Sequence, residues 1–134
     1  MPDLHLPAAF TTALGALTDW LDGEQVPYTV IGGVAVSFLA QPRATQDIDA
    51  VIWLDESQWE AFFRQGENHG FQQRLSDALE FAARSRVLLL RHQKTGISVD
   101  LSFGALPFEL EMIERATTLQ IGELRLKVPK PEDL

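Results

Sequence analysis

The chain has 134 residues, 46% of them hydrophobic and 22% charged, so we expect one globular domain over residues 1–134 that buries its own core. It contains no cysteine, which excludes disulfides, thiol catalysis and cysteine-based zinc sites. The 11 Lys and Arg residues against 19 Asp and Glu residues give a net charge of −8, which disfavours nonspecific nucleic-acid binding and leaves room only for a local basic pocket.

The N-terminal stretch "MPDLHLPAAF" lacks the basic start and apolar core of a signal peptide. No apolar run approaches the roughly 20 residues that a membrane-spanning helix needs. We therefore expect a cytoplasmic protein with no membrane partner.

The first half of the chain predicts alternating helices and strands. Phe10, Leu14 and Leu17 repeat at helical spacing after Pro7, and the run "VPYTVI" is rich in β-branched and aromatic residues. The pattern predicts a helix over 7–21, a strand over 26–31, a short helix over 34–41, a strand over 47–54, and a helix that follows a capping box at Asp55 and ends near 69–70.

The second half predicts hairpins. Residues 76–85 are compatible with either a short helix or an irregular connection. Strands over 86–92 and 97–103 flank a turn, a helix over 107–115 follows, and strands over 117–121 and 124–128 are joined by Gly122-Glu123. The fold class is therefore α/β or α+β, with a mixed β-sheet and helices packed mainly on one side.

Three aspartates fall on predicted strands. Asp47 and Asp49 are two residues apart in "DIDAVI", so their side chains share a face at roughly 6–7 Å between Cα atoms. Asp100 lies on the polar face of "ISVDLSF", a strand that can lie beside the first. One interpretation is an edge strand whose acidic face meets solvent. The other is a cation site, because neighbouring carboxylates repel unless a positive charge lies between them. Oxygen ligands alone favour Mg²⁺ or Mn²⁺ over zinc.

A glycine pair precedes these carboxylates. Gly32-Gly33 ends one predicted strand and opens a helix, where backbone N–H groups can bind a phosphate without a Cβ in the way. The pair also suits a simple tight turn. It is neither a Walker loop nor a dinucleotide-binding fingerprint.

Together these residues resemble the signature of the nucleotidyltransferases of the DNA polymerase β superfamily: Ile31-Gly32-Gly33, thirteen intervening residues, and Asp47-Ile48-Asp49. Asp100 matches the third carboxylate expected on a later strand. "IGGVAV", "PRATQDIDAVI" and "LKVPKPEDL" are similar to small bacterial nucleotidyltransferases related to abortive-infection toxins of toxin–antitoxin systems. In those relatives the last segment opens into further helices, whereas this sequence stops at Leu134.

The resemblance implies a nucleotidyltransferase fold and an enzyme that moves a nucleoside monophosphate from an NTP to a hydroxyl of a protein, a tRNA or a small molecule, releasing pyrophosphate. It implies that Asp47, Asp49 and Asp100 are catalytic and bind two Mg²⁺ ions. It further implies that Gly32 and Gly33 bind the nucleotide phosphates, and Arg43 is a candidate for the same role beside a surface or ion-pair role. The alternative is a catalytically silent module of the same fold that acts through a partner protein or as a homodimer.

Overall fold

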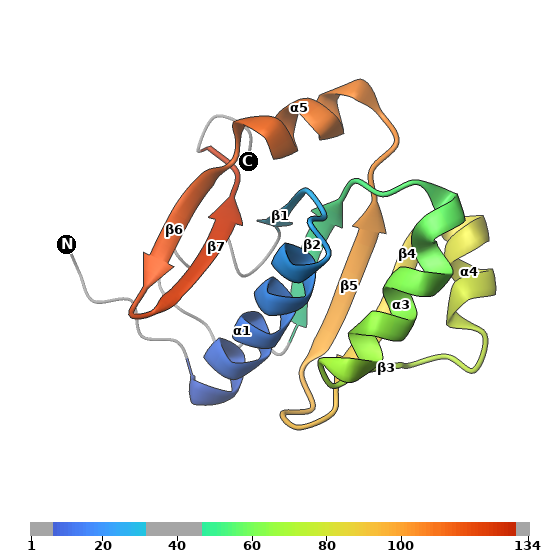
Figure 1. Ribbon diagram of the computed structural model, residues 1–134, viewed down its shortest axis with the longest axis horizontal. Coiled ribbons are helices and arrows are strands. Elements are labelled where there is room, and N and C mark those ends of the chain that lie inside the picture. The colour runs from blue at the N-terminus through green and yellow to red at the C-terminus, as the bar shows by residue number, and fades with distance from the viewer. Residues whose placement is uncertain (1–6, 32–46, 131–134) are drawn as a thin grey trace.

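The computed structural model describes residues 7–31 and 47–130, and Figure 1 shows how their elements are arranged. In chain order the elements are α1 (Ala8–Gly23), β1 (Tyr28–Ile31), β2 (Asp47–Ile52), the 3₁₀ turn η1 (Glu56–Gln58), α3 (Trp59–Asn68), β3 (Phe71–Gln73), α4 (Ala78–Ser85), β4 (Val87–His92), β5 (Ser98–Phe103), α5 (Pro107–Arg115), β6 (Thr117–Ile121) and β7 (Leu124–Val128). Within the described residues, no helix has the length and apolar character needed to cross a bilayer.

Five strands form one mixed sheet in the order β1-β2-β5-β4-β3. β2 and β5 are parallel neighbours at its centre, and the other pairs are antiparallel. The chain leaves β2, forms α3, β3, α4 and β4, and then returns as β5 beside β2. Two segments about 50 residues apart in sequence are thereby placed side by side.

One face of this sheet forms the core with α1 and α3, which lie over the same face in Figure 1. Ile48, Ala50, Val99 and Leu101 point into it and have no exposed surface, as strand alternation requires. We call this the core face. The alternate residues of the same strands define the opposite face.

Trp20 joins the two helices at the centre of the core. Its ring stacks on Phe62 of α3 with 4.3 Å between ring centroids, and its Nε1–H donates to the Phe62 carbonyl at 3.2 Å. A Cβ on Gly66, one turn later in α3, would lie 2.4 Å from the Trp20 ring. Only glycine therefore allows α3 to approach Trp20 this closely.

The β6–β7 hairpin packs against β1 as a second, two-stranded sheet. The Lys127 N–H donates to the Tyr28 hydroxyl at 3.3 Å, and the Thr29 hydroxyl donates to the Lys127 carbonyl at 3.5 Å. Leu126 of β7 is the buried residue of the hairpin and belongs to the hydrophobic core. The hairpin turn contains Gly122 at a φ of 60°, a left-handed conformation that glycine adopts without strain.

The structure confirms the predicted fold class and both predicted hairpins. The helical alternative for 76–85 is correct, because α4 spans Ala78–Ser85. The strand predicted over 26–31 begins at Tyr28, and the strand predicted over 47–54 ends at Ile52. β3 has no counterpart in the prediction, because three residues are too few to display an alternating pattern. The helix predicted over 34–41 lies outside the described residues.

Candidate active site

The sheet face opposite the core carries the predicted carboxylates, and we call it the carboxylate face. Asp47 is exposed, and Asp49 and Asp100 are half-buried. Each alternates with a fully buried core residue along β2 or β5. The same alternation that fills the core thus places all three carboxylates on one face.

The strand register brings two of them together. Asp49 of β2 pairs directly with Asp100 of β5, and neighbouring strands lie about 4.8 Å apart. Ile31 at the end of β1 pairs with Asp49 on its other side, and Leu89 of β4 pairs with Asp100. We call these four residues the Asp49 row.

A second row lies one pleat away on the same face. Asp47 pairs with Ser98, Ser98 pairs with Arg91 of β4, and Arg91 pairs with Gln72 of β3. Arg91 is exposed. This Asp47 row therefore carries an acidic residue at one end and a basic residue two strands away.

Arg74 brings a second basic group to this face. Its Nη2 donates a hydrogen bond to Asp100 Oδ1 in a salt bridge, with the two side chains 22% and 36% exposed. Sequence reasoning missed both Arg74 and Arg91. The alternation of "RVLLLRH" places Arg91 on the face of Leu89, so its position was accessible from the hairpin register, whereas Arg74 depends on the unpredicted strand β3.

The electrostatics of the face centre on Asp49. Burial raises the pKa of the Asp49 carboxyl above its ordinary value, and the carboxylates of Asp100 and Asp47 raise it further. The Arg74 guanidinium acts in the opposite direction. The charged form of Asp49 is therefore disfavoured by its neighbours, and an added cation would relieve that repulsion.

The donor set fits a hard divalent cation, since it consists of carboxylate oxygens beside hydroxyl groups and contains no sulfur or imidazole. Within residues 7–31 and 47–130, no three His, Asp or Glu side chains are gathered closely enough to form a metal cage as they stand. Asp100 is engaged by Arg74 instead. A cation that used all three carboxylates would share Asp100 with this arginine or displace the arginine from Asp100 Oδ1.

Three predicted nucleotide-binding residues, Gly32, Gly33 and Arg43, lie outside the described residues. Their segment follows Ile31 and precedes Asp47, and both of these residues are described. Because Ile31 pairs with Asp49, the chain leaves β1 and enters β2 next to the carboxylates.

Among the described residues, His92 lies on the core face and not on the carboxylate face. His92 is buried, its Nδ1 lies 2.8 Å from the Thr95 hydroxyl, and its ring contacts Phe71 with 5.0 Å between centroids. Burial lowers the pKa of the His92 imidazole, and Lys94 lowers it further. Its role is to pack and to brace the β4–β5 turn.

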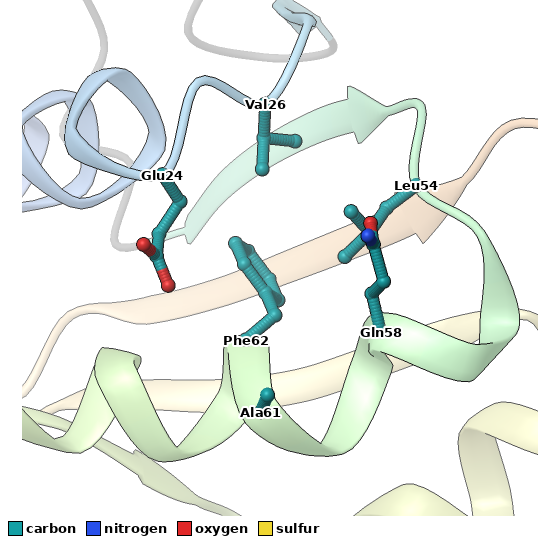
Figure 2. A pocket seen from close by; sticks show the side chains of 6 residues that line it. All are labelled: Glu24, Val26, Leu54, Gln58, Ala61 and Phe62. Carbon is teal, nitrogen blue, oxygen red and sulfur yellow. The ribbon is translucent and has the colours of Figure 1, made fainter.

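A separate hollow of about 240 Å³ lies on the helical side of the molecule (Figure 2). Its lining residues are Glu24, Val26, Leu54, Gln58, Ala61 and Phe62. Phe62 also stacks on Trp20, so one wall of the hollow is the outer surface of the core. None of the predicted site residues lines it.

No protein-family model matches the sequence, and comparison with curated proteins gives no significant match. Solved structures are similar. An antigenic nucleotidyltransferase-like protein from Paracoccidioides brasiliensis superposes with a TM-score of 0.62 at 19% identity, over 96% of this chain and 64% of its own. A putative nucleotidyltransferase from Thermotoga maritima also gives a TM-score of 0.62, at 16% identity, over 96% of this chain and 81% of its own. The chain has the nucleotidyltransferase fold.

A third similar structure is a lincosamide antibiotic adenylyltransferase bound to lincomycin, with a TM-score of 0.58 and 16% identity. The match covers 87% of this chain and 77% of the adenylyltransferase. At identities this low, the structural similarity shows a shared nucleotidyltransferase fold and nothing more. The chain spans 64% of the length of the fungal protein, less than two thirds.

Proposed function

We propose that this chain is a Mg²⁺- or Mn²⁺-dependent nucleotidyltransferase that moves a nucleoside monophosphate from an NTP to a hydroxyl acceptor. The observation that carries the proposal is the direct pairing of Asp49 with Asp100, with Asp47 two residues away on the same face. Aspartate is depleted in strands, and like charges directly opposite each other destabilise a sheet. A cation-binding function at this face would explain why Asp49 and Asp100 lie opposite each other in a chain with the nucleotidyltransferase fold.

In this proposal Asp47, Asp49 and Asp100 hold the divalent ion. When bound, the ion neutralises charge on the entering and leaving oxygens of phosphoryl transfer. Gly32 and Gly33 supply backbone N–H groups to the triphosphate, as the resemblance implies. Arg43 is a further phosphate donor on the same argument, since guanidinium groups bind phosphate through two parallel hydrogen bonds.

Arg91 extends the phosphate site. It is exposed on the carboxylate face and lies in the Asp47 row. A basic side chain there offsets the repulsion between a polyanionic nucleotide and a chain of net charge −8. Arg91 therefore supplies a local positive charge for nucleotide binding on a chain whose net charge is negative.

The reaction is an in-line displacement. The acceptor oxygen bonds to the α-phosphorus, the bond from that phosphorus to the oxygen bridging to the β-phosphate breaks, and pyrophosphate leaves with that oxygen. The hydroxyl proton passes to a carboxylate of the face. The acceptor is a hydroxyl of a small molecule, a protein or a tRNA, and the adenylyltransferase with a bound antibiotic supports the small-molecule class. A cytoplasmic, single-domain protein of a toxin–antitoxin or phage-defence system is the setting suggested by the resemblance.

The Arg74–Asp100 salt bridge favours a second candidate function. An arginine that permanently occupies the third carboxylate would leave a catalytically silent module of the same fold. Such a module would act through a partner protein or as a homodimer. The two candidates differ in metal-dependent nucleotide binding.

Calorimetric titration with ATP, GTP, CTP and UTP in the presence of Mg²⁺ tests the proposal. The native chain is expected to bind at least one nucleotide, and the Asp47→Asn/Asp49→Asn variant is expected to lose that binding. The matched control is Asp19→Asn/Asp22→Asn, which removes the same charge from exposed positions on α1. Native protein that binds none of the four nucleotides would contradict the enzyme proposal and favour the silent module.

A further inference from the structure

Arg74 reaches the Asp49 row through strand pairing that ends just before it. Gln73, the last residue of β3, pairs with Leu90, and the Arg74 N–H donates to the Leu89 carbonyl at 3.1 Å. Leu89 is in turn paired with Asp100. Arg74 thus extends the Asp49 row to a fifth position, two strands away from Asp100.

The backbone around Arg74 is held on both sides. The Gln73 side-chain oxygen accepts from the Ala78 N–H at 3.4 Å, which ties the end of β3 to the start of α4. From this position the arginine side chain passes Leu89 to reach Asp100 Oδ1. Its placement follows from the fold rather than from a chance surface contact.

The ion pair is only partly satisfied. Arg74 Nε is buried and has no hydrogen-bond partner among the described residues. A buried donor without an acceptor costs free energy. Arg74 therefore gives up little beyond the single Asp100 bond if its guanidinium moves.

The charges on the carboxylate face also favour the exchange of Arg74 for a divalent ion. Asp47, Asp49 and Asp100 carry three formal negative charges on one face, and Arg74 supplies one positive charge that lowers the electrostatic cost of ionising Asp49. A divalent ion would supply the same relief with twice the charge. Arg74 and such an ion cannot both make their closest contact with the same oxygen of Asp100.

We propose that Arg74 is a tethered cation that competes with the divalent metal ion for Asp100. This inference rests on the proposed function. In the metal-free chain Arg74 keeps Asp100 in an ion pair and so stabilises the strands that carry the three carboxylates. When the ion binds, Arg74 releases Asp100, and its guanidinium becomes available to an anion such as a phosphate oxygen.

The test is Mn²⁺ binding without nucleotide, measured from the free-ion signal in electron paramagnetic resonance. Arg74→Gln is expected to bind Mn²⁺ roughly twofold to fivefold more tightly than the native chain, the range set by a partly exposed ion pair. Arg74→Lys keeps the positive charge, so its affinity is expected to stay within about twofold of native. Arg84→Gln is the matched control, because it removes one exposed positive charge from α4.

Equal or weaker Mn²⁺ binding by Arg74→Gln would overturn the competition while leaving the metal site in place. If neither the native chain nor Arg74→Gln bound Mn²⁺, the metal-dependent function would fail with it. A gain in affinity by Arg84→Gln equal to that of Arg74→Gln would also overturn the proposal, because overall charge would then explain the effect.

A metal-free double-mutant cycle tests the ion pair without reference to the reaction. Chemical unfolding in EDTA compares the native chain with Arg74→Gln, Asp100→Asn and the double variant. Arg74→Gln is expected to lower the unfolding midpoint in the native background and to have a smaller effect beside Asp100→Asn. Added Mg²⁺ is expected to restore the midpoint of Arg74→Gln. Additive effects in EDTA would show that the two side chains are not coupled and would overturn the proposal.

Discussion

Asp49 and Asp100 lie directly opposite each other on the parallel strands β2 and β5, on the sheet face opposite α1 and α3. Both are half-buried, so water screens their repulsion less than at the surface. The pairing costs stability in the absence of a cation. It is the observation on which the binding function proposed for this face rests.

That cost predicts the behaviour of Asp49→Asn. Asparagine keeps the size of the side chain and removes the charge whose ionisation is opposed by burial, Asp100 and Asp47. In EDTA the variant is expected to gain up to about 1 kcal/mol in free energy of unfolding, the scale of a partly exposed charge interaction. Urea unfolding measures this gain. Stabilisation of the native chain by Mg²⁺ is expected to be absent in the variant, and a variant stabilised by Mg²⁺ as strongly as the native chain would count against the site.

Two helical glycines give a matched pair of packing predictions. Gly66→Ala would place a Cβ 2.4 Å from the Trp20 ring, so it is expected to destabilise the protein by about 1–3 kcal/mol through overpacking. Gly15→Ala meets no atom within 4 Å, and it is expected to stabilise α1 by roughly 0.5–1 kcal/mol. Urea midpoints of the two variants are compared with the native value. Equal changes in the urea midpoint for the two variants would contradict the close packing of Trp20 of α1 against α3.

Tyr28 is the only tyrosine of the chain, so its ionisation can be followed by absorbance alone. Burial raises the pKa of its hydroxyl to about 12, against a smaller opposing effect of the Lys127 N–H. Since the folded pKa lies above the usual 10, the stability this residue contributes is complete below pH 10 and is lost as the pH rises toward 12. Spectrophotometric titration is expected to give a midpoint well above that of free tyrosine. A midpoint near 10 in the folded protein would show that the β6–β7 hairpin does not cover β1.

Much of the fold could be predicted because it depends on local alternation. The sequence predicts which residues of each strand share a face with Asp47, Asp49 and Asp100, since every second residue of a strand lies on the same side. Their register does not, because β2 and β5 are joined by a long crossover that contains two helices and two strands. The direct opposition of Asp49 and Asp100 required the structure.

Arg74 illustrates the same limit. Its contact with Asp100 depends on the pairing of β3 with β4, and β3 has only three residues, two of them glutamine. Nothing in its local sequence distinguishes it from an arginine in a surface turn. Only the tertiary arrangement brings it to the carboxylates.

The central claim is that the carboxylate face binds a divalent ion, and paramagnetic broadening of backbone amide signals by Mn²⁺ tests it most directly. At substoichiometric Mn²⁺ we expect the signals of residues 47–49 and 98–100 to broaden first, while those of α3 on the core face persist. The Asp47→Asn/Asp49→Asn variant is expected to lose this selective broadening. Broadening centred instead on the acidic helix α5, or none at all, would contradict the account.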